Sequence, residues 1–210
     1  MNRLIGLTLI CLLAINLVKA QDYLIEEKSV SRVFQAEGMS KSEIMSKMES
    51  WYSNPETTPK DTIETLDLEK GFIRVRGEIK VLYKNIGTEL YPKRSQMADV
   101  LEAKFRHTIE MDVEDNAYVV KYYLNEMVKE MYGREAEFLN CINFVEIDEE
   151  ALEAYNRSMG KVLKMNFVFK KRREIFFDNS EVQFQEVSSY ILNEAQVNMF
   201  AAYDALKVED

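Results

Sequence analysis

Few residues in this chain have side chains suited to catalysis. His107 is the single histidine among 210 residues, so a His-rich metal site is excluded. The sequence contains no Gly-x-Ser-x-Gly motif, phosphate-binding glycine loop or Cys–His pair, so nucleophilic and nucleotide chemistry are unsupported. Because His107 falls in the apolar register of a predicted strand, we expect a structural or surface histidine rather than a catalytic one.

Carboxylates are abundant, with 36 Asp and Glu residues. They cluster at residues 112–115 (Asp-Val-Glu-Asp) and 148–150 (Asp-Glu-Glu). Neither cluster has the alternating ligands and mid-loop glycine of a calcium loop, so the first indicates a turn and the second a helix cap. A carboxylate pair for glycoside hydrolysis depends on spacing in three dimensions, which a sequence cannot assign. We therefore expect no catalytic residue, no metal and no cofactor.

The most unusual local feature is a basic segment between two aromatic clusters. It consists of Lys170, Lys171, Arg172 and Arg173, with Phe-Val-Phe at 167–169 before it and Ile-Phe-Phe at 175–177 after it. Such a segment could contact an anionic membrane surface or an acidic partner. The other interpretation, which we favour, is a solvated turn between two buried segments.

The elements that position these residues begin with a helix over 41–53. Ser40 and Glu43 form a capping box, apolar residues from Ile44 to Trp51 recur at helical spacing, and Asn54-Pro55 ends the helix. A β-prone stretch at 29–35 precedes it.

Alternating apolar and polar residues predict the strands of an antiparallel sheet. They cover 73–83, with a partner near 62–67, and a hairpin of 105–113 and 118–124 that turns at Glu114-Asp115-Asn116. Residues 85–100 show no period and are interpreted as a long surface loop.

The C-terminal third is mainly helical by its pattern. Asp148 is expected to cap one helix, and Ser180 is expected to cap another that continues to Leu206. The join between them, residues 164–180, is compatible with either strand or helix.

The first twenty residues have the pattern of a cleavable signal peptide. Arg3 provides a positive start, residues 4–18 are apolar, and Val18-Lys19-Ala20 ends the segment with small residues at the recognition positions. Cys11 lies within the apolar run, so lipidation is not expected. We expect an exported protein, periplasmic or extracellular, with no transmembrane span after cleavage.

Export has consequences for charge and for cysteine chemistry. Removal of 1–20 takes Arg3 and Lys19 from a chain of net charge −9 and leaves −11, which argues against a nucleic-acid partner. It also leaves Cys141 as the single cysteine, in an apolar setting where burial is expected.

The order of these elements resembles an exported bacterial family of unknown function that is described as having a TATA-binding-protein-like (TBP-like) fold. The similar features are the segment 38–43, Trp51, Gly71, Gly77 and the hairpin from Ile109 to Tyr118. The resemblance covers residues 28–126. It implies a curved antiparallel sheet with helices on one face, and it brings no catalytic residues with it. The fold's namesake binds DNA, but fold alone does not transmit function.

The predicted organisation is therefore a signal peptide at 1–20, an α+β TBP-like domain at 21–140 with four or five strands and helices packed on one face, and a helical extension at 141–210. We expect a cell-envelope protein, foremost a non-catalytic interaction or structural module. A carrier or sensor of an apolar small molecule is the alternative, supported by 22 Phe and Tyr residues, one Trp and 11 Met. A hydrolase is a more remote alternative. The expected partner is an envelope protein or an apolar small molecule.

Overall fold

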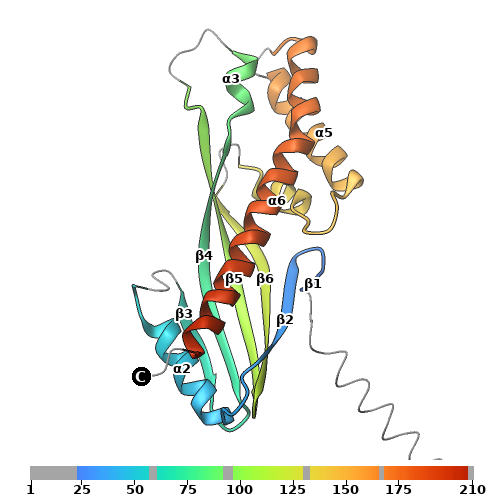
Figure 1. Ribbon diagram of the computed structural model, residues 1–210. Helices are drawn as coiled ribbons and strands as arrows, with labels where there is room; N and C mark the ends of the chain where they lie inside the picture. Colours follow the sequence, from blue (N-terminus) through green and yellow to red (C-terminus); the bar gives the residue numbers. More distant parts are fainter. Residues whose placement is uncertain (1–22, 57–60, 92–96, 130–132, 166–167, 208–210) are drawn as a thin grey trace, which may run out of the picture.

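A computed structural model describes residues 23–56, 61–91, 97–129, 133–165 and 168–207 (Figure 1). The expected signal peptide lies outside these residues. The described chain forms one antiparallel sheet with the strand order β1-β2-β6-β5-β4-β3, and helices lie along one of its faces. The α+β architecture expected from the sequence is confirmed. None of the described helices is both long enough and apolar enough to cross a bilayer.

The sheet has six strands, whereas the sequence pattern predicts four or five. Their bounds are β1 Leu24–Ile25, β2 Ser29–Gln35, β3 Thr62–Asp67, β4 Phe72–Lys84, β5 Val100–Glu114 and β6 Ala117–Lys129. The additional strand is β1, which pairs with Ser31 and Val30 of β2. Two residues are too few to show an alternating pattern, so the sequence carries no signal for it.

Helix α2 (Lys41–Ser53) begins where the capping box predicts. The Ser40 backbone N–H donates to Glu43 Oε2 over 2.8 Å, and the Glu43 N–H donates to Ser40 Oγ over 3.4 Å. The β5–β6 turn is bonded to the same region, because Asp115 Oδ1 accepts the Lys41 N–H and Asn116 Oδ1 accepts the Gly38 N–H. The segment 38–43 and the hairpin turn, both part of the family resemblance, are thus in contact.

Helix α6 (Lys170–Leu206) corrects two expectations. It begins ten residues before Ser180, so Ser180 is not a cap and the basic segment is not a turn. Ser180 is fully buried, and its hydroxyl donates to the Phe177 carbonyl and contacts Asn156. The hydroxyl is satisfied inside the helix, which is why a serine can stand there without starting one.

The loop expected at 85–100 contains a short helix, α3 (Ile86–Leu90). Asn85 forms its cap by accepting the Gly87 N–H, and the Asn85 amide donates to the Ala98 carbonyl across the connection. Five residues are too short for a helical period to emerge from sequence, and residues 92–96 lie outside the described part.

Helices α4 (Glu135–Cys141) and α5 (Glu149–Met165) pack with α6 around a cluster of aromatic rings. Phe184 of α6 lies 4.8 Å from Phe138 and 4.9 Å from Tyr155, edge to face in both cases. Asp148 caps α5 as predicted, because its Oδ1 accepts the N–H groups of Glu150 and Ala151.

The apolar core is continuous from the sheet into the C-terminal helices. Helix α6 follows the long axis of the sheet (Figure 1), and its inner face is buried through Phe184, Ile191, Ala195 and Met199. These side chains lie in the same cluster as Val30 and Ile109 of the sheet. The first half of the chain therefore depends on α6 to cover its apolar face.

Candidate functional site

The single histidine lies on the helix-covered face of the sheet. His107 is 7% exposed, and its Nε2 lies 3.4 Å from Oδ1 of Asp61, whose side chain is also buried. The imidazole stacks on Tyr122 of the neighbouring strand with 4.9 Å between ring centroids. The arrangement is a His–Asp pair enclosed by protein, and it suits a structural contact more than attack on a substrate.

Gly77 makes room for this pair. It is paired with His107 across β4 and β5. A Cβ atom at Gly77 would lie 1.9 Å from Asp61 Oδ1 and 2.4 Å from His107 Nε2, distances that real contacts do not show. Gly77 is one of the residues of the family resemblance, and the close approach of Asp61 and His107 gives a physical reason for a glycine there.

Tyrosines surround the pair. Burial raises the pKa of the Tyr52 and Tyr122 hydroxyls far above the ordinary value, and the nearby carboxylate of Asp61 acts in the same direction. The Tyr52 hydroxyl donates to Asn198 Oδ1 of α6 over 3.1 Å. Both phenols therefore stay protonated, and neither serves as a base.

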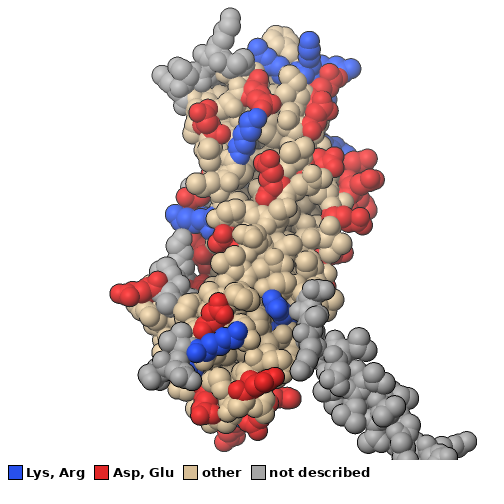
Figure 2. All heavy atoms as spheres, in the orientation of Figure 1, with Lys and Arg blue, Asp and Glu red and all other residues tan. Residues whose placement is uncertain are grey.

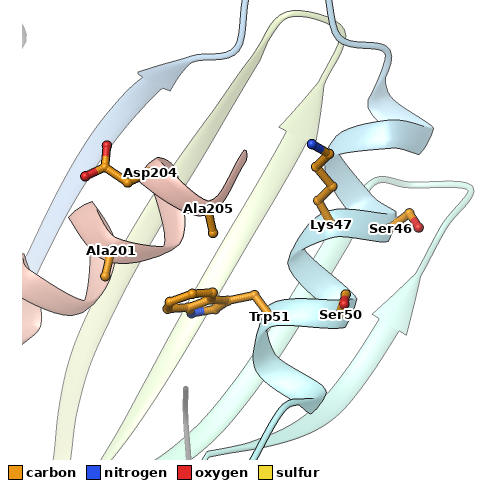
Figure 3. Close-up of a pocket in the computed structure, with 7 residues that line it drawn as sticks. All are labelled: Ser46, Lys47, Ser50, Trp51, Ala201, Asp204 and Ala205. Carbon is orange, nitrogen blue, oxygen red and sulfur yellow. The ribbon is translucent and has the colours of Figure 1, made fainter. Parts of the chain in front are cut away.

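A surface groove of about 720 Å³ separates α2 from the end of α6 (Figure 3). Trp51 extends across it toward Ala201 and Ala205, and the rim carries Lys47 and Asp204. The indole is half-buried, and the Lys47 ammonium donates to the Leu206 carbonyl over 3.2 Å. Since the groove is open and its walls are mixed in polarity, it lacks the enclosed apolar character of a carrier site.

A second hollow, of about 560 Å³, lies between the α4–α5 connection and α6. Glu146, Glu149 and Glu181 line it together with apolar residues. Within the described residues, no three His, Cys, Asp or Glu side chains are placed to share a metal ion.

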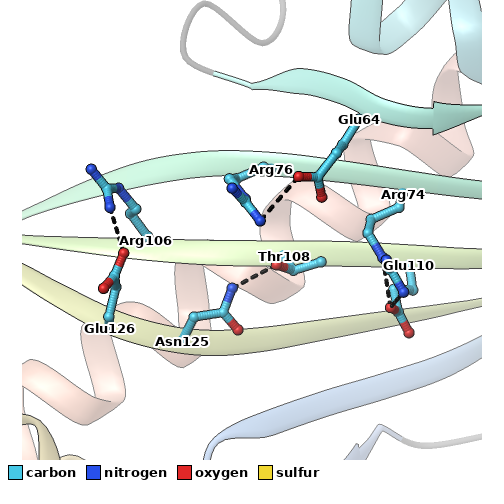
Figure 4. A network of polar contacts seen from close by, with 8 residues as sticks. All are labelled: Glu64, Arg74, Arg76, Arg106, Thr108, Glu110, Asn125 and Glu126. Carbon is cyan, nitrogen blue, oxygen red and sulfur yellow. Dashed lines mark hydrogen bonds and ion pairs between the residues drawn. The ribbon is translucent and has the colours of Figure 1, made fainter.

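The open face of the sheet carries charges that neutralise one another across the strands (Figure 4). The ion pairs are Arg76–Glu64 at 3.0 Å, Arg74–Glu110 at 2.7 Å and Arg106–Glu126 at 2.5 Å, and Asn125 donates to Thr108 between them. Around these residues the open face is a solvated surface of paired charges, and toward one end it also exposes Leu82 and Val100.

The basic segment forms the first turn of α6, at the upper end of the molecule in Figure 1. Arg173 donates to the Val168 carbonyl, and the Arg172 guanidinium lies 5.5 Å from the Tyr91 ring centroid. Lys170 and Lys171 are exposed. Arg172 and Arg173 thus contact their own protein and are partly covered, whereas Lys170 and Lys171 face solvent, with Glu174 lying 3.8 Å from Lys170.

The outward face of α6 exposes four large apolar side chains that the sequence analysis did not single out. They are Val182 (51% exposed), Tyr190 (44%), Val197 (55%) and Phe200 (45%). At 3.6 residues per turn, they lie within about 80° of one another around the helix axis. We call these four residues the α6 stripe. Their spacing, out of phase with the buried positions, is the signal that could have revealed them.

Cys141 is fully buried, as the sequence predicts. Burial raises the pKa of its thiol to about 12, against the opposing effect of Lys28, whose ammonium donates to the carbonyls of Leu139 and Ile142. The thiol of the unfolded chain titrates near 9.0. Its contribution to stability is therefore complete below pH 9 and is lost as the pH rises from 9 toward 12.

We expect that Cys141 does not react with a thiol reagent at pH 8 while the protein is folded. Only the thiolate reacts, and here the thiol is both protonated and inaccessible. Labelling of the mature protein, which lacks Cys11, with iodoacetamide should show no adduct by intact mass in buffer and one adduct in denaturing urea. Complete labelling of the folded protein within minutes would contradict the burial of Cys141.

The chain matches one family of known sequences over part of its length. Residues 31–124 match the family described as "Domain of unknown function (DUF4468) with TBP-like fold". No curated protein matches the chain. The resemblance inferred from the sequence is confirmed over these residues.

Two solved structures are similar to this chain. A DUF4468 family protein from Bacteroides ovatus ATCC 8483 aligns with a TM-score of 0.40 and 18% identity, over 50% of this chain and 57% of that one. A TBP-like protein from Parabacteroides distasonis ATCC 8503 aligns with a TM-score of 0.48 and 13% identity, over 87% of this chain and 94% of that one.

Proposed function

Residues 31–124 carry the DUF4468 domain with its TBP-like fold, and on this premise we propose that the protein is a non-catalytic interaction module of the cell envelope. Its binding surface for another protein is the α6 stripe. The proposal includes export through the signal peptide at 1–20 and a periplasmic or extracellular location.

The observation that carries the proposal is the exposure of Val182, Tyr190, Val197 and Phe200 on one helical face. Apolar side chains gathered on a surface mark sites of protein association, because their burial removes apolar area from water. A helix face of this kind fits a groove or a second helix in the partner. The stripe spans residues 182–200, about 27 Å at the helical rise.

The packing between α6 and the sheet favours this role over the carrier alternative. A carrier needs volume between the layers, but Ile191, Ala195 and Met199 are at most 1% exposed and fill the space against the sheet. The hollows at Trp51 and at Glu181 lie on the surface instead.

The net negative charge and the paired arginines of the open face argue against a nucleic-acid partner. The open face of the sheet pairs its arginines with glutamates, and the whole chain has a net charge of −9. Binding to phosphates requires unpaired cations in excess, and the three arginines named on this face are each paired with a glutamate.

Site-specific photocrosslinking tests the α6 stripe. Benzoylphenylalanine replaces Val197 on the stripe, and in a control it replaces Arg76 on the open face, where the side chain is 58% exposed. After irradiation of intact cells, we expect a discrete adduct of higher mass from position 197 and none from position 76. Equal adducts from both positions, or none from position 197, would contradict the proposed surface.

The intact mass of the same purified protein tests export. We expect a chain that begins at Gln21, because signal peptidase cleaves after the small residue Ala20. A chain that retains Met1 and fractionates with the cytoplasm would contradict export.

A further inference from the structure

We propose that the end of the molecule formed by α5 and α6 docks on an anionic lipid bilayer. The surface, which we call the basic tip, consists of Lys161, Lys164, Met165, Phe169, Lys170 and Lys171, all of them exposed. It does not overlap the α6 stripe, which begins at Val182, so the protein could bind a bilayer and a protein partner together.

The basic tip is built where two helices meet. Helix α5 ends at Met165, helix α6 begins at Lys170, and Val168 is buried between them with its N–H bonded to the Leu163 carbonyl. A Cβ atom added at Gly160 of α5 would lie 3.3 Å from the Phe177 ring of α6, so the two helices pack closely near this surface. The exposed side chains therefore lie beside one another where the end of α5 meets the start of α6.

Two apolar side chains protrude where the two helices meet. Met165 is 79% exposed and Phe169 is 77% exposed, the two highest values for large apolar residues in the described chain. Leu163 and Val168, their neighbours in sequence, are buried. Leu163 and Val168 thus pack in the core, whereas Met165 and Phe169 are exposed to water. Burial of these two side chains in an apolar environment would be favourable.

Cations surround the two apolar residues. Lys161 and Lys164 come from the last turns of α5, and Lys170 and Lys171 come from the first turn of α6. The nearby carboxylate of Glu174 lies 3.8 Å from Lys170, whose side chain is 84% exposed. In Figure 2, several basic side chains stand together at the upper end of the molecule, with acidic side chains beside them and over the rest of the visible surface.

Two exposed apolar side chains surrounded by lysines favour an anionic bilayer over an acidic protein as the binding partner of the basic tip. A stable protein interface needs roughly 1,000 Å² of complementary surface, whereas this surface is a convex corner with two protruding side chains. A bilayer suits a corner: the apolar side chains enter the headgroup region and the lysines remain beside the phosphates. Each lysine near an anionic surface strengthens binding by about fivefold at moderate ionic strength.

Vesicle sedimentation tests the proposal with purified mature protein. The vesicles contain phosphatidylcholine alone or with about one third phosphatidylglycerol. The tip variant is Phe169→Ser/Lys170→Glu. The matched control, Leu68→Ser/Lys70→Glu, makes the same kinds of change at the other end of the sheet, where Leu68 is 59% exposed and the Lys70 side chain is 81% exposed.

We expect binding to the anionic vesicles and not to the neutral ones, with a loss of at least tenfold in the tip variant and no loss in the control. High salt should also release the protein, because the lysine contacts are screened. Equal binding of the two variants, or no binding of the wild type, would overturn the proposal. Retention of the wild type on polyglutamate but not on anionic vesicles would also overturn it, in favour of an acidic polypeptide.

An environment-sensitive label gives an independent readout. Because Cys141 is buried, an NBD fluorophore can be attached selectively to Phe169→Cys or, as a control, to Leu68→Cys. Anionic vesicles should shift only the Phe169→Cys emission to the blue, and an unshifted spectrum would contradict entry of this residue into the bilayer. The assay contains no other protein, so its result is separate from the test of the α6 stripe.

Discussion

Replacement of Phe184 by alanine is expected to destabilise the whole described chain by roughly 3 to 5 kcal/mol. Phe184 is fully buried in α6 and packs edge to face against Phe138 of α4 and Tyr155 of α5. Truncation removes this ring from the centre of the aromatic cluster, and the cavity cannot close without moving three helices. Urea unfolding, followed by Trp51 fluorescence and by far-ultraviolet circular dichroism, measures the effect.

The two signals also test how α6 and the sheet unfold. Trp51 of α2 faces Ala201 and Ala205 near the end of α6, so its fluorescence reports the contact between α6 and the first half of the chain. A coincident shift of both transitions would show that this contact and the secondary structure are lost together. The control is Phe200→Ala on the same helix, where the ring is 45% exposed and the loss should be below about 1 kcal/mol. If Phe184→Ala shifts the helical signal and leaves the Trp51 transition in place, the aromatic cluster of α4, α5 and α6 unfolds separately from the end of α6 that faces Trp51. The expected domain boundary at residue 140 stays a prediction until this is measured.

Replacement of Gly77 by alanine is expected to cost about 3 kcal/mol. The new Cβ would collide with Asp61 Oδ1 and His107 Nε2 on the covered face of the sheet. Overpacking of this kind costs roughly 1 to 3 kcal/mol, and separation of the buried polar pair adds a further penalty of about 1 to 3 kcal/mol. The midpoint of urea unfolding at neutral pH measures the loss.

Two controls separate the collision from a general effect of glycine replacement. Gly160→Ala in helix α5 meets only the end of the Phe177 ring at 3.3 Å, so it should be close to neutral. In a His107→Ala background, Gly77→Ala should cost less than in the wild type, because one of the two colliding groups has gone. A cost that is unchanged in this background would place the strain outside the His107–Asp61 pair.

The long elements could be predicted because their patterns repeat. In strands β4 to β6, apolar and polar residues alternate over seven or more positions. The capping box at Ser40 and the cap at Asp148 mark the starts of α2 and α5 directly. Strand β1 and helix α3 are shorter than one readable period, so tertiary pairing alone reveals them. Ser180 misled the prediction because serine favours caps on average, whereas here the helix continues through it and satisfies its hydroxyl.

The candidate sites were less predictable than the fold. His107 could be placed on the apolar face from its register, but its contact with Asp61 depends on how β3 pairs with β4, and a shift lies within that pairing. The spacing of the α6 stripe was a usable signal in the sequence, but the structure was needed to show that its four side chains are exposed. The basic segment was recognised from the sequence. The exposure of Met165 and Phe169 beside it could be recognised only from the way α5 and α6 meet in the structure.

The central claim is that the protein binds another protein through the outward face of α6. Native mass spectrometry of the protein, purified without refolding from the cells that produce it, tests this most directly. We predict a complex with a second protein chain, which is lost in a Tyr190→Glu/Val197→Glu variant of unchanged melting temperature. A stoichiometric apolar small molecule on an otherwise bare chain would contradict the claim and establish the carrier function instead.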